Sequence, residues 1–191
     1  MKTVSMSGSP RENVGKKDAK ALRRKGLVPC VMYGGDKQVS FSVAETEFKP
    51  LLFTPDTHYV ELNIDGEKTK VILQEIQYHP VSDAVIHADF LRLFDDKPIT
   101  ISVPIKAVGV APGVLQGGKL ETKIRKMKLK GLPNDMPQYV EVDISNLNIA
   151  QSIKVEDIKI PNIEKLDVKS SIVLWVKSTR QAATAATTEA S

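Results

Sequence analysis

Hydrophobic and polar residues alternate along much of the chain, and this pattern predicts β-strands rather than long helices. Residues 60–64 alternate in this way and lead into an Asp-Gly pair at 65–66, which is typical of a tight hairpin turn. We therefore expect residues 68–78 to form the second strand of a hairpin. Other apolar or alternating runs predict strands at residues 27–33, 39–43 and 84–93.

Alternation continues in the second half of the chain and predicts strands at residues 99–105, 140–144 and 172–176. Segment 120–130 is ambiguous, because some of its apolar residues fit helical spacing while others fit two strand phases. We interpret this segment as one strand with a bulge.

Two segments favour short helices. Gly15–Lys25 is filled with helix-forming residues and is followed by Gly26, a common stop signal. Residues 44–53 are a weaker candidate because Pro50 interrupts them. The sequence therefore predicts a mainly β protein with a few short helices, of the α+β class.

A polar, turn-forming stretch at Leu93–Pro98 separates the two strand-rich halves. It predicts two domains, residues 1–94 and 95–177. The final segment, residues 178–191, is rich in alanine and threonine and has no large apolar side chain, so we expect a disordered tail there.

The composition excludes several classes of protein. Hydrophobic residues make up 41% and charged residues 26% of the 191 positions, as in ordinary globular proteins. The longest strongly apolar run, Ile172–Val176, is far shorter than the roughly 20 residues of a membrane span. No secretory signal is recognisable, so a cytoplasmic location is expected. The single cysteine, Cys30, lies in an apolar strand and is expected to be buried and unreactive.

The net charge of +4 is modest, but its distribution is uneven. Residues 1–25 contain eight basic and two acidic residues, whereas residues 26–94 contain five basic and ten acidic ones. The middle of the chain would repel a polyanion, so we expect a small, oriented polyanion site near the N-terminus.

The predicted N-terminal helix concentrates cations on one side, with Ala19 and Leu22 on the other. Such a helix can pack on a small domain and direct its charges at phosphates, although an ordinary solvated surface is the alternative. Arg11 upstream and Tyr33 downstream bring another cation and a stacking ring towards the same surface. The helical cations are Lys16, Lys17, Lys20, Arg23 and Arg24.

Three histidines, His58, His79 and His87, raise the question of a metal site. Their spacing matches no metal-binding motif, so no metal is expected. His79, His87 and Asp89 lie near predicted strand ends, where they could hydrogen-bond within the protein or contact base edges and 2′-hydroxyls of RNA.

Two further motifs have alternative interpretations. Gly113–Lys119 fits part of a phosphate-binding loop, but Leu120 stands where serine or threonine would bind magnesium, so a flexible loop is favoured. Lys123–Lys130 has five basic residues and is either an edge strand protected by lysine or a second phosphate contact. No arrangement of nucleophile and base is recognisable, so no catalytic residue is expected.

Four segments together carry a resemblance to a known family. The chain resembles the bacterial 5S-rRNA-binding ribosomal protein family twenty-five of the large subunit, in the long two-domain form also called general stress protein Ctc. The segments are RENVGKKDAKALRRKGLVPCVMYGG, LQEIQYHPVSDAVIHADFLRL, VPIKAVGVAPGVLQGGKLE and LPNDMPQYVEVDISNL.

The resemblance implies a β-barrel-like N-terminal domain, similar to the anticodon-binding domain of glutaminyl-tRNA synthetase, followed by a mainly β domain. It also implies that the first domain binds the loop E region of 5S rRNA on its minor-groove side. Ala19 and Ala21 replace a serine and an arginine of some relatives, so the contacts of those positions are not carried over. The implied contacts are Arg11, Lys16, Lys20, Arg23, Tyr33, Gln74, Gln77, His79, His87 and Asp89.

We therefore expect a non-enzymatic structural component of the large ribosomal subunit that binds 5S rRNA, located on the ribosome in the cytoplasm. The second domain is expected to meet neighbouring ribosomal proteins or other rRNA. No cofactor, metal, membrane or small-molecule substrate is expected. The alternatives are a stand-alone stress factor that binds other structured RNA such as tRNA, and a nucleotide-dependent enzyme that uses residues 113–119.

Overall fold

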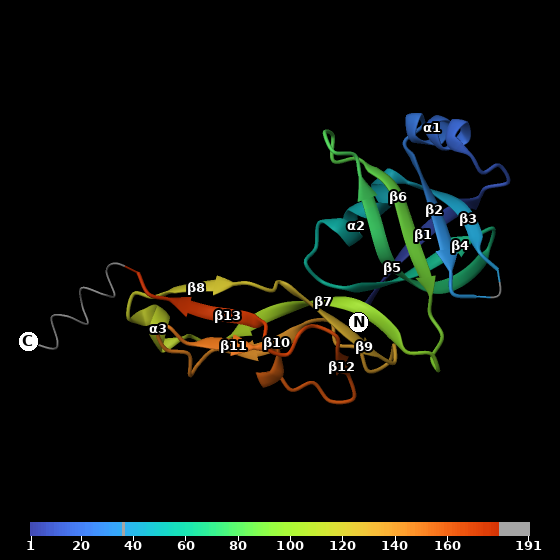
Figure 1. Cartoon of the computed structure of the whole chain (residues 1–191). Helices are drawn as coiled ribbons and strands as arrows, with labels where there is room; N and C mark the ends of the chain where they lie inside the picture. The colour runs from blue at the N-terminus through green and yellow to red at the C-terminus, as the bar shows by residue number, and fades with distance from the viewer. Residues whose placement is uncertain (36, 180–191) are drawn as a thin grey trace, which may run out of the picture. The chain divides into compact units, whose positions relative to one another are not determined.

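The computed structural model describes residues 1–35 and 37–179. The chain forms two compact units (Figure 1). The first contains residues 1–99 together with 132–134, and the second contains residues 100–131 and the chain from Asp135 onward. Each unit has its own buried core, so each is considered separately.

The first unit is a closed six-stranded barrel with strand order β1-β3-β2-β6-β5-β4 (Figure 1). Its interior is filled by aliphatic side chains around Phe41, Phe48 and Phe90. The barrel confirms the architecture that the family resemblance implies. The strands are β1 (Lys2–Pro10), β2 (Leu27–Tyr33), β3 (Val39–Ala44), β4 (His58–Ile64), β5 (Glu67–Tyr78) and β6 (Val85–Arg92).

Local signals account for most of the barrel. The β4–β5 hairpin turns at Asp65 and Gly66, both with positive φ, as the Asp-Gly pair predicts. Helix α1 (Lys16–Arg24) follows β1 and lies outside the barrel (Figure 1). The weaker helix prediction is confirmed by a 3₁₀ turn, η1 (Glu45–Phe48), and by α2 (Lys49–Leu52), which has Pro50 in its first turn, where proline is tolerated.

Strand β1 closes the barrel and was not expected from the sequence. It pairs in parallel with β4 and in antiparallel fashion with β3. Its serine- and glycine-rich sequence has low strand propensity, so pairing on both sides, rather than local preference, determines its conformation. A Cβ on Gly8 would lie 2.8 Å from the ring of Phe41, so a larger residue here would have to displace this buried ring.

The second unit contains a four-stranded sheet of order β10-β7-β9-β12 and a three-stranded sheet of order β11-β13-β8. Met127, Leu129, Val142 and Leu174 are among its buried residues. The strands are β7 (Ile99–Val108), β8 (Lys119–Thr122), β9 (Lys126–Gly131), β10 (Val140–Asp143), β11 (Ser152–Lys154), β12 (Glu164–Lys165) and β13 (Ile172–Lys177), with the short helices α3 (Pro112–Leu115) and η2 (Val155–Asp157).

The interpretation of residues 120–130 as one bulged strand is wrong. The segment forms two strands in different sheets, since β8 pairs with β13 while β9 lies between β7 and β12. The change occurs at residues 123–125, where the N–H of Lys123 donates to Val173 and the carbonyl of Arg125 accepts from Ile105. Because β9 is an interior strand, its lysines do not protect a sheet edge.

The glycine loop after β7 is packed rather than flexible. A Cβ on Gly113 would lie 2.6 Å from the main chain of Asn148 and Ile149, and one on Gly118 would lie 2.5 Å from the Gly113 carbonyl. The N–H groups of Gly113 and Gly118 donate to Leu147 and Gly113, so they are not directed at a phosphate. The glycines therefore serve close packing, and the loop does not form a nucleotide site.

The expected disordered tail falls mainly on residues 180–191, which lie outside the described residues. Just before them, the hydroxyl of Thr179 donates to the carbonyl of Gly117. Within the part of the chain that the structure describes, no helix is long and apolar enough to cross a membrane.

Candidate nucleic-acid interface

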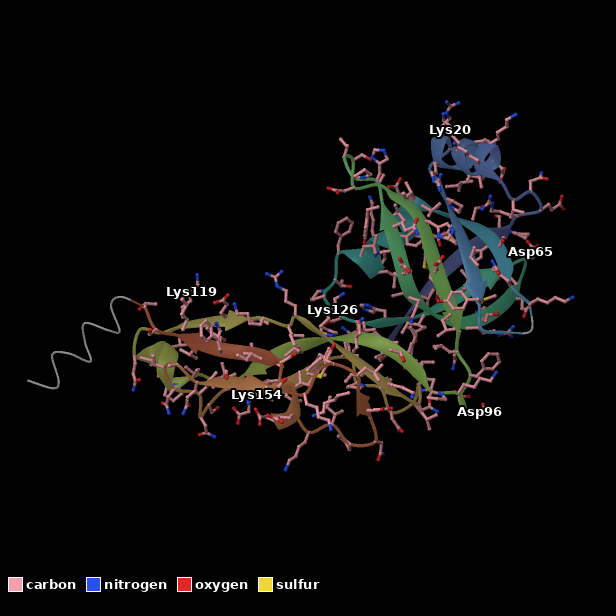
Figure 2. All side chains as sticks on the ribbon, in the orientation of Figure 1. Lys20, Asp65, Asp96, Lys119, Lys126 and Lys154 are labelled. Carbon is pink, nitrogen blue, oxygen red and sulfur yellow. The ribbon has the colours of Figure 1, made fainter. Side chains whose placement is uncertain are left out.

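Helix α1 presents a cationic surface to solvent. Its half-buried residues, Asp18, Ala19 and Leu22, form the side that faces the barrel, and no residue of the helix is fully buried. Lys20 lies on the outer side of the helix, where Figure 2 labels it. The exposed cations of α1 are Lys16, Lys17, Lys20, Arg23 and Arg24.

Arg11 fixes the start of α1 to the end of β1. One Nη of Arg11 lies 2.7 Å from an Asp18 carboxylate oxygen and also donates to the carbonyl of Asn13. Its main-chain N–H donates to Ser40 on β3. The side chain is only 9% exposed, so the structure directs it at the protein and not at solvent. Asp18 in the first helical turn also interacts favourably with the helix dipole.

Arg23 fixes the other end of α1. A bulge shifts the pairing of β5 and β6, so that Gln77 lies opposite His87 and Tyr78 lies opposite Val85. Ile86 is left without a strand partner, and its carbonyl accepts a 2.9 Å hydrogen bond from Nε of Arg23. The helix is thereby tied to β6 near the polar residues of that strand.

The outer face of strands β2, β6 and β5 brings together residues that are far apart in the sequence. Val31 of β2 lies beside Asp89 of β6, and Tyr33 lies beside Leu91. Across the other edge of β6, Gln77 pairs with His87 and Glu75 pairs with Asp89. A second bulge between Leu73 and Glu75 contains the exposed Gln74. Residues of three strands that were predicted to contact RNA therefore share one face. The hydrogen bond from Arg23 to the carbonyl of Ile86 joins α1 to β6, which is one of these strands.

Tyr33 lies close to the acidic residues of this face. Partial burial is the largest influence that raises the pKa of its hydroxyl, and the carboxylates of Asp89 and Glu75 raise it further. The hydroxyl therefore stays protonated at neutral pH and can donate as well as accept a hydrogen bond. The residue is 38% exposed, so its ring is accessible for stacking.

His87 and Asp89 form a pair on β6. Nδ1 of His87 lies 2.9 Å from a carboxylate oxygen of Asp89, and both side chains are more than two-thirds buried. Because a carboxylate can only accept, Nδ1 carries a proton. In the neutral imidazole Nε2 is then an acceptor, and the pair holds the ring in a fixed orientation.

His79 has the opposite arrangement. Its Nδ1 faces the main-chain N–H groups of Val81 and Ser82 at 3.4 and 3.3 Å and accepts from them, which supports the turn between β5 and β6. In the neutral ring the proton is then on Nε2, which can donate. His79 and His87 therefore offer different hydrogen-bonding groups to a ligand.

Two contributions to this surface were not anticipated from the sequence. Glu75 lies directly opposite Asp89, and the carbonyl of Ile86 holds Arg23. The period of two along β5 places Glu75 and Gln77 on one face and could have revealed Glu75. The role of Ile86 depends on a bulge that no local signal predicts. His58 lies elsewhere, with Nδ1 near the Asp56 carbonyl, and no group of three or more metal-ligating side chains occurs among the described residues.

Comparisons with known proteins identify the family. Residues 6–90 match the Ribosomal L25p family, and residues 98–180 match the C-terminal domain of ribosomal protein TL5. The large ribosomal subunit protein bL25 of Christiangramia forsetii is 42% identical over 183 residues, which cover 94% of this chain and 83% of that protein.

Other relatives agree along nearly their whole length. The bL25 protein of Porphyromonas gingivalis strain W83 is 40% identical over 97% of this chain and 98% of its own, and that of Cytophaga hutchinsonii is 42% identical over 92% of each. These relatives are proteins of the large ribosomal subunit and not enzymes, which confirms the expectation that the chain is not an enzyme. The chain therefore belongs to the ribosomal L25p family of large ribosomal subunit proteins, in the form that carries a TL5-type C-terminal domain.

Proposed function

We propose that this protein is a structural component of the large ribosomal subunit that binds the loop E region of 5S rRNA through its barrel unit. Together with the family membership, one structural observation supports the proposal. In the barrel unit, the cationic side of α1 lies next to the polar outer face of β2, β6 and β5. The Arg23–Ile86 hydrogen bond makes these two surfaces neighbours.

The two surfaces have complementary roles in this proposal. The exposed cations of α1 contact phosphates, which gives affinity that depends on salt but little on sequence. Tyr33, Gln74, Gln77, His87 and Asp89 then read base edges and 2′-hydroxyls, which are accessible in the wide minor groove of RNA. The fixed His87 ring offers Nε2 as an acceptor.

Arg11 and Arg23 have a positioning role in this mechanism. Arg11 joins β1 to the first turn of α1, and Arg23 joins the last turn to β6. Because both ends of the helix are fixed before binding, less conformational entropy is lost when its lysines meet phosphates. Arg11 therefore contributes to RNA affinity through the placement of α1.

The test is a chemical footprint of 5S rRNA with the full chain, together with sedimentation of cell extract in gradients with high magnesium. We expect protection within loop E and migration of the chain with large subunits. A chain that stays in the free pool and protects tRNA as well as 5S rRNA would instead indicate a stand-alone RNA-binding stress factor. Binding of ATP or GTP in calorimetry would contradict both.

A further inference from the structure

Among the described residues, strand β10 of the second unit lies at a sheet edge and has a neighbouring strand on one side only. The N–H of Ile144 donates to the carbonyl of Val108, which fixes the phase of pairing between β10 and β7. In a parallel pair, alternate residues face the neighbouring strand. Val142 thus faces β7, while the N–H and C=O groups of Glu141 and Asp143 face the open side. No strand of the described chain pairs with β10 there.

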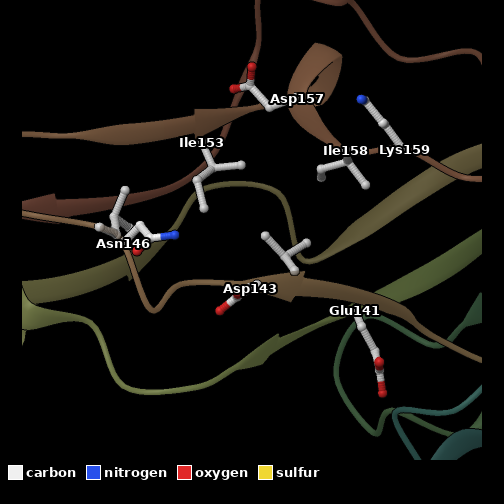
Figure 3. A pocket seen from close by; sticks show the side chains of 9 residues that line it. Glu141, Asp143, Asn146, Ile153, Asp157, Ile158 and Lys159 are labelled. Carbon is white, nitrogen blue, oxygen red and sulfur yellow. The ribbon is translucent and has the colours of Figure 1, made fainter.

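A groove follows this open side of β10. It consists of two cavities of about 350 and 520 Å³ that share Glu141 and Lys159. One wall is β10, and the other is formed by residues 153–160, which include part of β11 and the turn η2 (Figure 3). The groove is therefore long enough to follow the whole strand.

The floor and the rim of the groove differ in chemistry. Ile153 and Ile158 point into the space above β10 in Figure 3, and Val142 also lines it. Apolar side chains from both walls thus form the inner surface of the groove, which is called its floor below.

The rim is mainly acidic. Glu141, Asp143 and Asp157 line the groove against one cation, Lys159. The hydroxyl and the N–H of Ser145 donate to Asp143 and lower the pKa of its carboxyl, so this group stays charged. Asp157 is held by the N–H of Lys154 at 2.8 Å.

The acidic side chains also bear on which strand could pair with β10. Edge strands are commonly protected by lysine, proline or a bulge, and none of these occurs within β10. Pairing of two copies of β10 would bring Glu141 and Asp143 close to like charges, which is unfavourable. A segment of opposite charge is complementary.

We propose that the groove along β10 binds an extended segment of a partner protein in which lysine or arginine alternates with apolar residues. The segment adds to the sheet as a further strand and pairs with the main chain of Glu141 and Asp143. Its apolar side chains cover the partly exposed Ile153 beside the buried Ile158, and its cationic side chains meet the acidic rim. This protein-binding site is separate from RNA binding by the barrel.

The first experiment measures binding of three fluorescein-labelled heptapeptides to the full chain by fluorescence anisotropy. One alternates lysine and valine, one has the same composition in two blocks, and one alternates glutamate and valine. We expect the alternating basic peptide to bind at least tenfold more tightly than either control. In NMR spectra it should shift the amide signals of Glu141 and Asp143.

The second experiment uses Glu141→Pro. The N–H of Glu141 faces the open side, so proline removes a donor for the peptide without removing a bond to β7. We expect at least a tenfold loss of peptide affinity, with the melting temperature and 5S rRNA affinity unchanged. Glu141→Gln keeps the N–H and should show a smaller loss that disappears at high salt. Glu164→Gln, on the opposite edge of the sheet, is the control and should bind normally.

Three results would overturn the proposal. These are equal binding of all three peptides, full affinity of Glu141→Pro, and amide shifts confined to residues outside the groove. Should Glu141→Pro melt at a lower temperature, the amide shifts in the unaltered chain and the Glu141→Gln salt series decide the question. Self-association that Glu141→Pro abolishes would assign the groove to a second copy of the chain instead.

Discussion

The two units differ in the groups that they leave available for binding. In the closed barrel every strand has neighbours on both sides, so a ligand meets mainly side chains. The four-stranded sheet of the second unit ends at β10, where the main chain itself is open on one side within the described part of the chain. A closed sheet suits recognition of phosphates and bases, whereas an open edge suits recognition of another strand.

The basic segments of the two units also differ. The acidic residue of α1, Asp18, is already paired with Arg11, so the exposed helical cations have no compensating carboxylate on the helix. In the second unit Lys130 lies 3.4 Å from Glu164, and Lys123 lies 2.9 Å from a Glu121 oxygen. Two of the five cations in Lys123–Lys130 therefore have a carboxylate partner, whereas the exposed cations of α1 have none on their own helix.

The largest effect on stability is expected where the barrel closes. Gly8→Val places a branched side chain against the ring of Phe41 and should lower the free energy of unfolding of the barrel by about 2 to 3 kcal/mol. Urea unfolding followed by near-ultraviolet circular dichroism measures the change. Trp175, the single tryptophan, reports the second unit, and its fluorescence transition should not move.

Ser9→Val is the matched control for this substitution. Ser9 is exposed on the same strand, so valine there should change the free energy of unfolding by less than about 0.5 kcal/mol. Equal losses for Gly8→Val and Ser9→Val would contradict the close fit of β1 over Phe41. A shifted Trp175 transition would show that the two units unfold together.

Side-chain recognition by the barrel face can be tested at His87 and Asp89. Alanine at either position should weaken binding of 5S rRNA by about 1 to 3 kcal/mol, by analogy with base-edge contacts, and leave the salt dependence unchanged. Affinities for 5S rRNA and an unrelated hairpin, measured at several salt concentrations, separate the two roles. Equal losses on both RNAs with a lower melting temperature would mean that the pair only supports its own strand.

Local patterns in the sequence were sufficient for several elements. The Asp65-Gly66 turn, the alternation around it and the glycine that ends α1 each act within a few residues, so they could be recognised without tertiary information. The grouping of cations on α1 follows from helical geometry alone. The end of α1 and the position of its cations, which form the helical part of the candidate interface, could therefore be predicted from the sequence.

Other features depend on long-range pairing. Strand β1 has weak local preference and is held by β3 and β4, and residues 120–130 divide between two sheets because each half finds a different partner. The burial of Arg11 depends on Asp18 and on the neighbouring β3 strand. A sequence pattern contains charge and hydrophobicity but not the identity of the partner, so these features required the structure.

The contrast between the two basic segments predicts a smaller effect. Lys16→Ala with Lys20→Ala should weaken binding of all RNAs alike and reduce the slope of log affinity against log salt by somewhat under one unit per lysine. Lys126→Ala with Lys128→Ala is the matched pair on β9 and should leave the 5S rRNA affinity and slope unchanged. Equal reductions for both pairs would mean that both units contact the RNA.

The smallest effect is expected at Cys30, which reports on the barrel alone because it is the single cysteine. The side chain is fully buried, and burial is the main cause that raises the pKa of its thiol from 9.0 to about 12. At pH 8 the folded barrel therefore contains an unreactive thiol, and iodoacetamide should label it only through unfolding.

The same shift in pKa predicts how stability depends on pH. Above pH 9 the thiol of Cys30 ionises in the unfolded chain but not in the folded one, so the free energy of unfolding of the barrel should fall. Saturating 5S rRNA should slow labelling, because it binds only the folded barrel, whereas the basic peptide should leave the rate unchanged. Rapid labelling of the native protein would contradict the burial of Cys30. Labelling that 5S rRNA does not slow would contradict the assignment of RNA to the closed barrel, and protection by the peptide would contradict its assignment to the open edge.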